Sequence, residues 1–98
     1  MTDIVRILSA EPVIHGVLKM KWSDGFEGIV DLRNFMAIGK VYLPLRDPQF
    51  FQTVKVTELG HSIEWIDGNG RQIDFGADSM QALSRAQADL LLNSTRAA

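Results

Sequence analysis

The sequence predicts an α+β fold: two antiparallel β-hairpin or meander units, a short helix between them and a C-terminal amphipathic helix. The first observation is a repeated pattern, Trp-x-Asp-Gly-x5-Asp, which begins at Trp22 and again at Trp65. Asp-Gly is typical of tight hairpins, because a type I′ turn needs positive φ at both central residues and glycine adopts it without strain. The second observation is that apolar and polar residues alternate on either side of each Asp-Gly. The third is the helical spacing of apolar residues after position 79.

The first hairpin is expected to follow a strand over 4–10, which Pro12 and Gly16 bring to an end. Strands over 17–22 and 26–32 then flank the turn. Every second residue of these two strands shares one face, which we expect to be buried. The residues of this face are Leu18, Met20, Trp22, Phe26, Gly28, Val30 and Leu32.

A short helix is expected over 32–38, between the two hairpin units. Asp31 lies near its N-cap, and Gly39 stands at the C′ position, where a left-handed residue is common. Residues 41–48 are irregular. Asp47-Pro48 predicts a single turn of helix, because the carboxylate caps the turn and proline fits its first position.

The second half predicts a three-stranded meander with turns at 59–61 and 67–70. The expected strands are 53–58, 62–66 and 71–75. Their inward-facing residues are Val54, Val56, Ile63, Trp65, Ile73 and Phe75.

A final helix is expected from a cap at Asp78 or Ser79 to about Asn93. At 100° per residue, one stripe of this helix is apolar, with Gln87 interrupting it. The stripe consists of Met80, Leu83, Ala86, Leu90 and Leu91. Residues 1–93 then form one domain, and 94–98 are expected to be a disordered tail.

Composition excludes several classes of function. A net charge of −2 and ten scattered Lys and Arg residues give no reason to expect a nucleic-acid or membrane-surface partner. The chain of 98 residues has no cysteine, which excludes disulfides, thiolate metal sites and cysteine nucleophiles. The first residues lack the apolar run of a signal peptide, and no stretch is long enough to span a membrane. We therefore expect a cytoplasmic protein.

No motif of the sequence predicts a catalytic, cofactor or metal site. Asp67 opens a loop that resembles an EF-hand, but Arg71 stands where a calcium loop needs an oxygen ligand. His15 and His61 lie in separate predicted turns, without local partners at metal-ligand spacing, and are expected to be exposed. The serines lie outside any Gly-x-Ser-x-Gly elbow and are interpreted as turn, cap or surface residues: Ser9, Ser23, Ser62, Ser79, Ser84 and Ser94.

The acidic residues raise the alternative of a paired-carboxylate site. Alternation places Glu27 and Asp31 opposite the apolar face, which favours a solvated sheet surface instead. The full set comprises Asp24, Glu27, Asp31, Glu58, Glu64, Asp67 and Asp74.

Three apolar residues are candidates for an interaction surface. Tyr42 and Phe50 lie in the irregular middle segment, and loops held by a scaffold often carry function. Leu92 falls off the apolar stripe, since Leu90 to Leu92 cannot all face one core.

The region from Val5 to Phe75 resembles the bacterial domain of unknown function 2442. The resemblance rests on an ordered set of motifs: Asp24-Gly25, Gly28-Ile-Val-Asp31-Leu32, Gly39-x-Val41-Tyr42-x-Pro44-Leu45-x-Asp47-x3-Phe51, Val54 with Val56, Ile63-Glu64-Trp65-x-Asp67-Gly68, and Asp74. It implies a small α+β fold. Some members of that family carry a following helix-turn-helix domain, and others are suspected of acting beside a small protein in toxin–antitoxin-like pairs. Here a single helix stands in place of that domain, which argues against direct DNA binding.

Taken together, these features predict a non-catalytic protein-interaction or self-association module, whose partner is a second copy or a small protein. One alternative is an accessory or regulatory protein of a toxin–antitoxin-like or DNA-linked system. A second is an unrecognised hydrolase that uses carboxylates.

Overall fold

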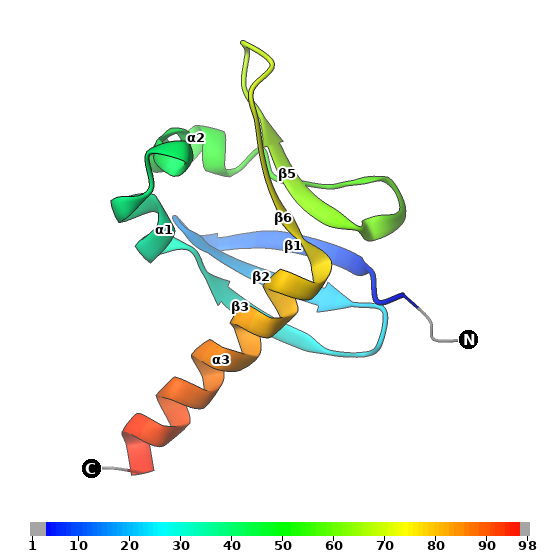
Figure 1. The fold of residues 1–98 in the computed structure, drawn as a ribbon, viewed down its shortest axis with the longest axis vertical. Helices are drawn as coiled ribbons and strands as arrows, with labels where there is room; N and C mark the ends of the chain where they lie inside the picture. Colours follow the sequence, from blue (N-terminus) through cyan, green and yellow to red (C-terminus); the bar gives the residue numbers. More distant parts are fainter. Residues whose placement is uncertain (1–3, 97–98) are drawn as a thin grey trace.

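The computed structural model describes residues 4–96 and confirms the α+β fold. Two three-stranded antiparallel sheets, ordered β1-β2-β3 and β4-β5-β6, enclose one hydrophobic core (Figure 1). The elements in chain order are β1 (Ile7–Ile14), β2 (Val17–Trp22), β3 (Glu27–Asp31), α1 (Arg33–Ile38), the 3₁₀ helix η1 (Lys40–Arg46), α2 (Pro48–Phe51), β4 (Lys55–Val56), η2 (Glu58–Gly60), β5 (Ser62–Ile66), β6 (Gln72–Gly76) and α3 (Ala77–Arg96).

Strand β1 differs from its predicted bounds. It begins at Ile7 and continues through Pro12 to Ile14, so the expectation that Pro12 ends it was wrong. Pro12 lies opposite Leu18, with register shifts on both sides of the segment. Proline has no backbone N–H to donate to a neighbouring strand. It is tolerated here because β1 is the outer strand of its sheet.

The hairpin between β2 and β3 is present, but its turn is not type I′. Gly25 N–H donates to the Trp22 carbonyl (3.1 Å), and Trp22 N–H donates to the Phe26 carbonyl (2.9 Å). Gly25 alone has positive φ in this loop, at 91°. A type I turn followed by a left-handed glycine therefore closes the loop.

The second hairpin repeats this geometry with an offset of two residues. Asp67 takes the place of Trp22: its N–H donates to the Arg71 carbonyl, and Gly70 N–H donates to the Asp67 carbonyl. The residue with positive φ is Gly70, at 81°, rather than Gly68. The repeated motif predicts two hairpins correctly, yet its two Asp-Gly pairs occupy different turn positions.

The predicted inward faces of the strands are largely confirmed. The core residues that they supply are Leu18, Met20, Trp22, Val30, Leu32, Ile63, Trp65, Ile73 and Phe75. Each indole N–H reaches a carbonyl of another element. Trp22 Nε1 donates to Ala77 at the start of α3 (3.1 Å), and Trp65 Nε1 donates to Phe51 at the end of α2 (2.9 Å). The two tryptophans thus satisfy their polar atoms while joining the sheets to the helices.

The middle segment is more regular than predicted. Residues 40–46 form η1, with Pro44 inside it. Asp47 caps α2 as expected, because its side chain accepts from Gln49 N–H (3.0 Å). Gly39 follows α1 but has φ −94°, so the left-handed conformation expected of it is absent. A Cβ there would lie 2.6 Å from the Tyr42 ring, so close approach explains this glycine.

The second half forms the predicted meander, with a shorter first strand. Only Lys55 and Val56 pair with β5, whereas 53–58 was expected. The chain then bends through η2, where Leu59 has φ 70° and Gly60 has φ 72°. Gly60 lies against β1, since a Cβ on it would come within 2.5 Å of the Ile7 carbonyl oxygen. This contact fits the packing of the two sheets at that corner.

The C-terminal helix α3 begins at Ala77, ahead of the expected cap. Its first half packs on β3 and β6, and the remainder extends past the body of the fold (Figure 1). The predicted stripe is therefore wrong beyond Leu83, because Ala86, Leu90 and Leu91 are exposed. The expected tail over 94–98 overlaps this helix up to Arg96, and residues 97 and 98 lie outside the described part of the chain.

Candidate functional site

The outer edge of β3 is covered by polar side chains of α3. The Ser84 hydroxyl donates to the Ile29 carbonyl (2.9 Å). The Gln87 amide donates to the Asp31 carbonyl and accepts from the Asp31 N–H, both at 2.9 Å. An outer strand presents unpaired backbone groups to any passing strand. Here these two side chains occupy the positions that an added strand would use.

Sequence reasoning placed these two residues differently. Ser84 was interpreted as a turn, cap or surface residue, yet it is 3% exposed. Gln87 was treated as an interruption of the apolar stripe, whereas it is one of the residues that attach α3 to β3. Their signal in the sequence is the i, i+3 spacing of two hydrogen-bonding residues on one helix face.

The same edge continues to the turn of the first hairpin. Gln81 Nε2 donates to the Asp24 carboxylate (3.2 Å). Phe26 N–H donates to the same carboxylate (3.0 Å), and this bond, followed by that from Gln81, lowers the pKa of Asp24. The Arg85 guanidinium stacks over Phe26, 4.1 Å from the ring centre. The first half of α3 is therefore attached along the whole hairpin.

Alongside these attachments, α3 and β3 leave a groove of about 570 Å³, and Ser84 and Gln87 themselves line it. Its walls are mainly apolar, with Phe26, Gly28 and Ile29 on the sheet side. Ala88, Leu90 and Leu91 line it from the helix. Leu90 is 70% exposed and Leu92 is 58% exposed. This groove and the exposed leucines, which we call the α3–β3 surface, form the candidate site.

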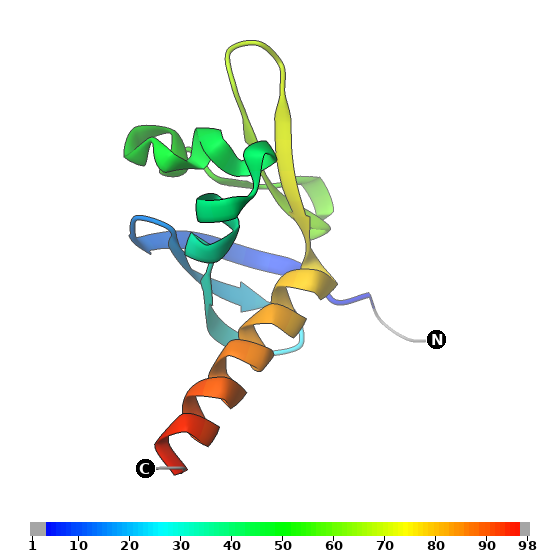
Figure 2. The same cartoon turned by 60° about the vertical axis from the view of Figure 1, so that its left-hand side comes forward.

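The three residues predicted for interaction do not come together. Tyr42 is half-buried, stacked on Phe75 with 5.4 Å between ring centres, and Phe50 is half-buried against the core. Tyr42 belongs to η1 and Phe50 to α2, whereas Leu92 belongs to α3, whose C-terminal end extends away from those two helices (Figure 2). Of the three, Leu92 belongs to the α3–β3 surface.

The acidic residues are used mainly in local structure. Asp31 makes a bidentate pair with Arg33, whose Nη2 lies 2.7 Å from Oδ2. This hydrogen-bonded pair lowers the pKa of the Asp31 carboxyl and raises the pKa of the Arg33 guanidinium. Asp67 accepts from the N–H groups of Asn69 and Arg71 within its turn. Within residues 4–96, no three His, Asp or Glu side chains are placed to hold a metal ion.

Both histidines are exposed, as predicted. The His15 ring nevertheless makes specific contacts: Nε2 lies 2.8 Å from the Leu45 carbonyl oxygen, and the ring meets Phe51 edge-on. It joins the β1–β2 turn to η1 and α2.

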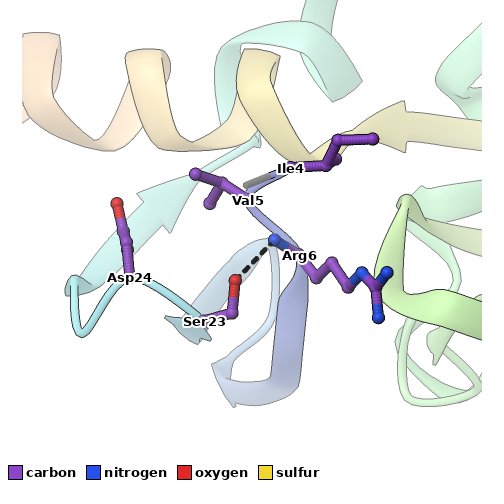
Figure 3. A pocket seen from close by; sticks show the side chains of 5 residues that line it. All are labelled: Ile4, Val5, Arg6, Ser23 and Asp24. Carbon is purple, nitrogen blue, oxygen red and sulfur yellow. Dashed lines mark hydrogen bonds between the residues drawn. The ribbon is translucent and has the colours of Figure 1, made fainter. Parts of the chain in front are cut away.

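A second hollow, of about 470 Å³, lies where the chain enters β1. Its lining is Ile4, Val5, Arg6, Ser23 and Asp24 (Figure 3). Arg6 N–H donates to the Ser23 hydroxyl (2.8 Å), which fixes the chain before the strand. The Arg6 guanidinium points away from the Asp24 carboxylate, so the two charges do not converge on one point. This hollow lacks the paired groups that acid–base chemistry needs.

No helix within residues 4–96 is both long and apolar enough to cross a membrane. Comparison with known proteins found no matching family model, no similar curated protein and no similar solved structure.

Proposed function

We propose that this chain is a non-catalytic self-association module, and that two copies meet through the α3–β3 surface. The observation that carries the proposal is the exposure of Leu90, which lines an apolar groove, and of Leu92, which follows two residues later on the same helix. Contiguous exposed apolar side chains on a small domain are typical of contact sites.

The geometry of α3 supports the proposal. The side-chain hydrogen bonds of Ser84 and Gln87 join α3 to β3, and the helix continues beyond them to Arg96. An isolated helix shorter than about 12 residues is marginal in water, and most helices are stabilised by packing. A second copy that covers this part of α3 would supply that packing.

Self-complementarity favours a second copy over an unrelated partner. The groove needs apolar side chains to fill it, and the leucines that would do so lie beside it on the same helix. In a twofold dimer each copy contributes both halves of such a contact. Arg85 and Asp89 are one helical turn apart, so antiparallel α3 helices that cross near position 87 bring Arg85 of each copy towards Asp89 of the other.

The expected affinity is modest. The groove and the exposed leucines form a small contact surface, whereas a standard stable interface buries ~800 Å² per partner. We therefore expect a dimer that dissociates in the micromolar range.

Sedimentation velocity over a series of protein concentrations tests the proposal. The wild-type chain should shift from monomer to dimer, and Leu90→Glu and Leu92→Glu should remain monomeric with unchanged circular dichroism. Ile66→Glu is the matched control, since Ile66 is equally apolar and 52% exposed on β5. A wild-type chain that stays monomeric at the highest concentration would overturn the proposal, as would leucine variants that dimerise like the control.

A crosslinking experiment tests the arrangement of the two copies. The chain has no cysteine, so Ala88→Cys introduces a single thiol near the proposed twofold axis. Oxidation should yield a covalent dimer, whereas Asp74→Cys on β6 should yield none at the same concentration. Equal crosslinking of the two variants would contradict an α3-mediated dimer.

A further inference from the structure

A different hollow lies on the other side of the molecule, where the β5–β6 hairpin passes η1 and α2 below its tip (Figures 1 and 2). It has a volume of about 350 Å³, at the small end of the range for ligand sites. Its apolar lining comes from Val41 and Pro44 of η1, Phe50 of α2 and Ile73 of β6. Segments distant in the sequence thus build one pocket.

Two cationic side chains line this pocket, Lys40 from η1 and Arg71 from the hairpin turn. The ion pairs within residues 4–96 are Lys21–Glu27 and Arg33–Asp31. Neither Lys40 nor Arg71 is therefore paired with a described carboxylate. Two unpaired cations at the rim of an apolar pocket favour an anionic ligand.

The acidic groups near the pocket do not cancel this preference. Asp67 lines it, but one oxygen of its carboxylate already accepts from the N–H groups of Asn69 and Arg71. Glu64 lies on the neighbouring strand and accepts from the Gln72 side-chain amide (2.7 Å). Both carboxylates accept hydrogen bonds from local donors, whereas the ion pairs of residues 4–96 include neither cation.

The pocket walls are held in place from behind. Tyr42 stacks on Phe75 and meets Phe35 edge-on, which fixes η1 against β6. Trp65 holds α2 through the Phe51 carbonyl. Two hydrogen bonds close the hairpin turn. Asp67 N–H donates to the Arg71 carbonyl, and Arg71 N–H donates to the Asp67 carboxylate. A ligand would therefore meet preformed walls, which reduces the entropy cost of binding.

We infer that this pocket binds a small organic carboxylate with an apolar body, its carboxylate between Lys40 and Arg71 and its chain against Phe50 and Ile73. The site is separate from the α3–β3 surface and independent of self-association.

Titration of ¹⁵N-labelled protein with octanoate, below its critical micelle concentration, tests this inference. Amide shifts should concentrate in residues 40–43 and 71–73. Octylammonium, which has the same chain and the opposite charge, should shift them little. No saturable shift with octanoate, or equal binding of octylammonium, would overturn the inference. So would octanoate shifts confined to the α3–β3 groove.

Charge variants test the roles of the two cations. Lys40→Gln and Arg71→Gln should each weaken octanoate binding by about tenfold, the effect expected for the loss of one charge-assisted contact. Both side chains are exposed, so these variants should keep the fold. Lys19→Gln, an exposed cation on β2, is the control and should bind like wild type. Unchanged affinity in both variants would contradict the site, and Leu92→Glu should bind octanoate normally whether or not self-association is confirmed.

Discussion

The side-chain amide of Gln87 forms two hydrogen bonds with the backbone of Asp31, one to its carbonyl and one from its N–H, both at 2.9 Å. The two residues are separated by 56 positions in the chain. This pair gives an outer strand the bonds that another strand would otherwise supply. Gln87 and Asp31 also line the groove between α3 and β3.

Replacing Gln87 should destabilise the fold more than replacing a polar side chain on the surface usually does, because Gln87 bonds the backbone of β3. Gln87→Ala leaves both backbone groups of Asp31 without their partner, and the expected loss is about 1–3 kcal/mol of unfolding free energy. Urea denaturation followed by tryptophan fluorescence measures it. Gln81→Ala removes only an exposed bond to Asp24, so it should cost less than about 0.5 kcal/mol. Equal effects of the two substitutions would show that the Asp31 bonds add nothing to stability.

Gly28 allows α3 to lie close to β3. A Cβ at this position would come within 2.3 Å of the Ser84 hydroxyl oxygen and 3.0 Å of the Phe26 ring. Gly28→Ala should therefore push the helix outward and cost about 1–3 kcal/mol. The double variant Gly28→Ala/Ser84→Ala should lose less stability than the sum of the single variants, because the closest atom is gone. Additive losses in a denaturation cycle would contradict this contact.

The repeated motif aligns Gly25 with Gly68, but replacing these two glycines by alanine should change the stability of the fold by different amounts. Gly25 and Gly70 have positive φ, Gly68 does not, and no neighbouring atom would meet a Cβ at any of the three. Gly25→Ala and Gly70→Ala should each cost about 1 kcal/mol from backbone strain, and Gly68→Ala should be close to neutral. Thermal denaturation of the three variants distinguishes them. A loss at Gly68 equal to that at Gly25 would contradict the two-residue offset.

The Asp31–Arg33 pair should make stability depend on pH at the acidic end. The folded state lowers the pKa of Asp31, so the folded chain binds fewer protons than the unfolded chain there. The contribution of the ionised Asp31 carboxylate to stability is complete above the pKa of Asp31 in the unfolded chain, about 3.9. It is lost as the pH falls through the lower pKa of Asp31 in the folded chain. The pair is largely exposed, so Asp31→Asn should cost at most about 1 kcal/mol at neutral pH.

Urea denaturation of wild type and Asp31→Asn over a range of acidic pH values measures this dependence. The difference between them should shrink as the pH falls, and Arg33→Gln should show the same trend because it removes the same pair. A difference that stays constant with pH would mean that the carboxylate charge is not its source.

The strands show what could be predicted locally. Alternation places Leu18, Met20 and Trp22 on one face whatever lies opposite, because successive side chains of a strand point to opposite sides. All three are buried. The positions of the two hairpins also follow from a local signal, the Asp-Gly pair. The turn type does not, because it depends on which residues of the two strands form hydrogen bonds across the turn.

The helix α3 shows where local reasoning fails. Helical spacing groups Leu90 with Met80, yet Met80 is 2% exposed and Leu90 is 70% exposed. Periodicity gives the direction in which a side chain points, but only a neighbouring element can bury it. Ser84 and Gln87 hold α3 against β3 by hydrogen bonds, whereas Leu90 and Leu92, further along the same helix, remain 70% and 58% exposed.

The α+β class, the two hairpins and the inward faces of the strands follow from residues that are close together in the chain, so local patterns predict them. The cover of the β3 edge by Ser84 and Gln87, and the pocket that Lys40 and Arg71 share, emerge only in the folded chain. The physical reason is that such sites are formed by segments that meet only after the chain has folded, and no local pattern encodes how far one packed element extends along another.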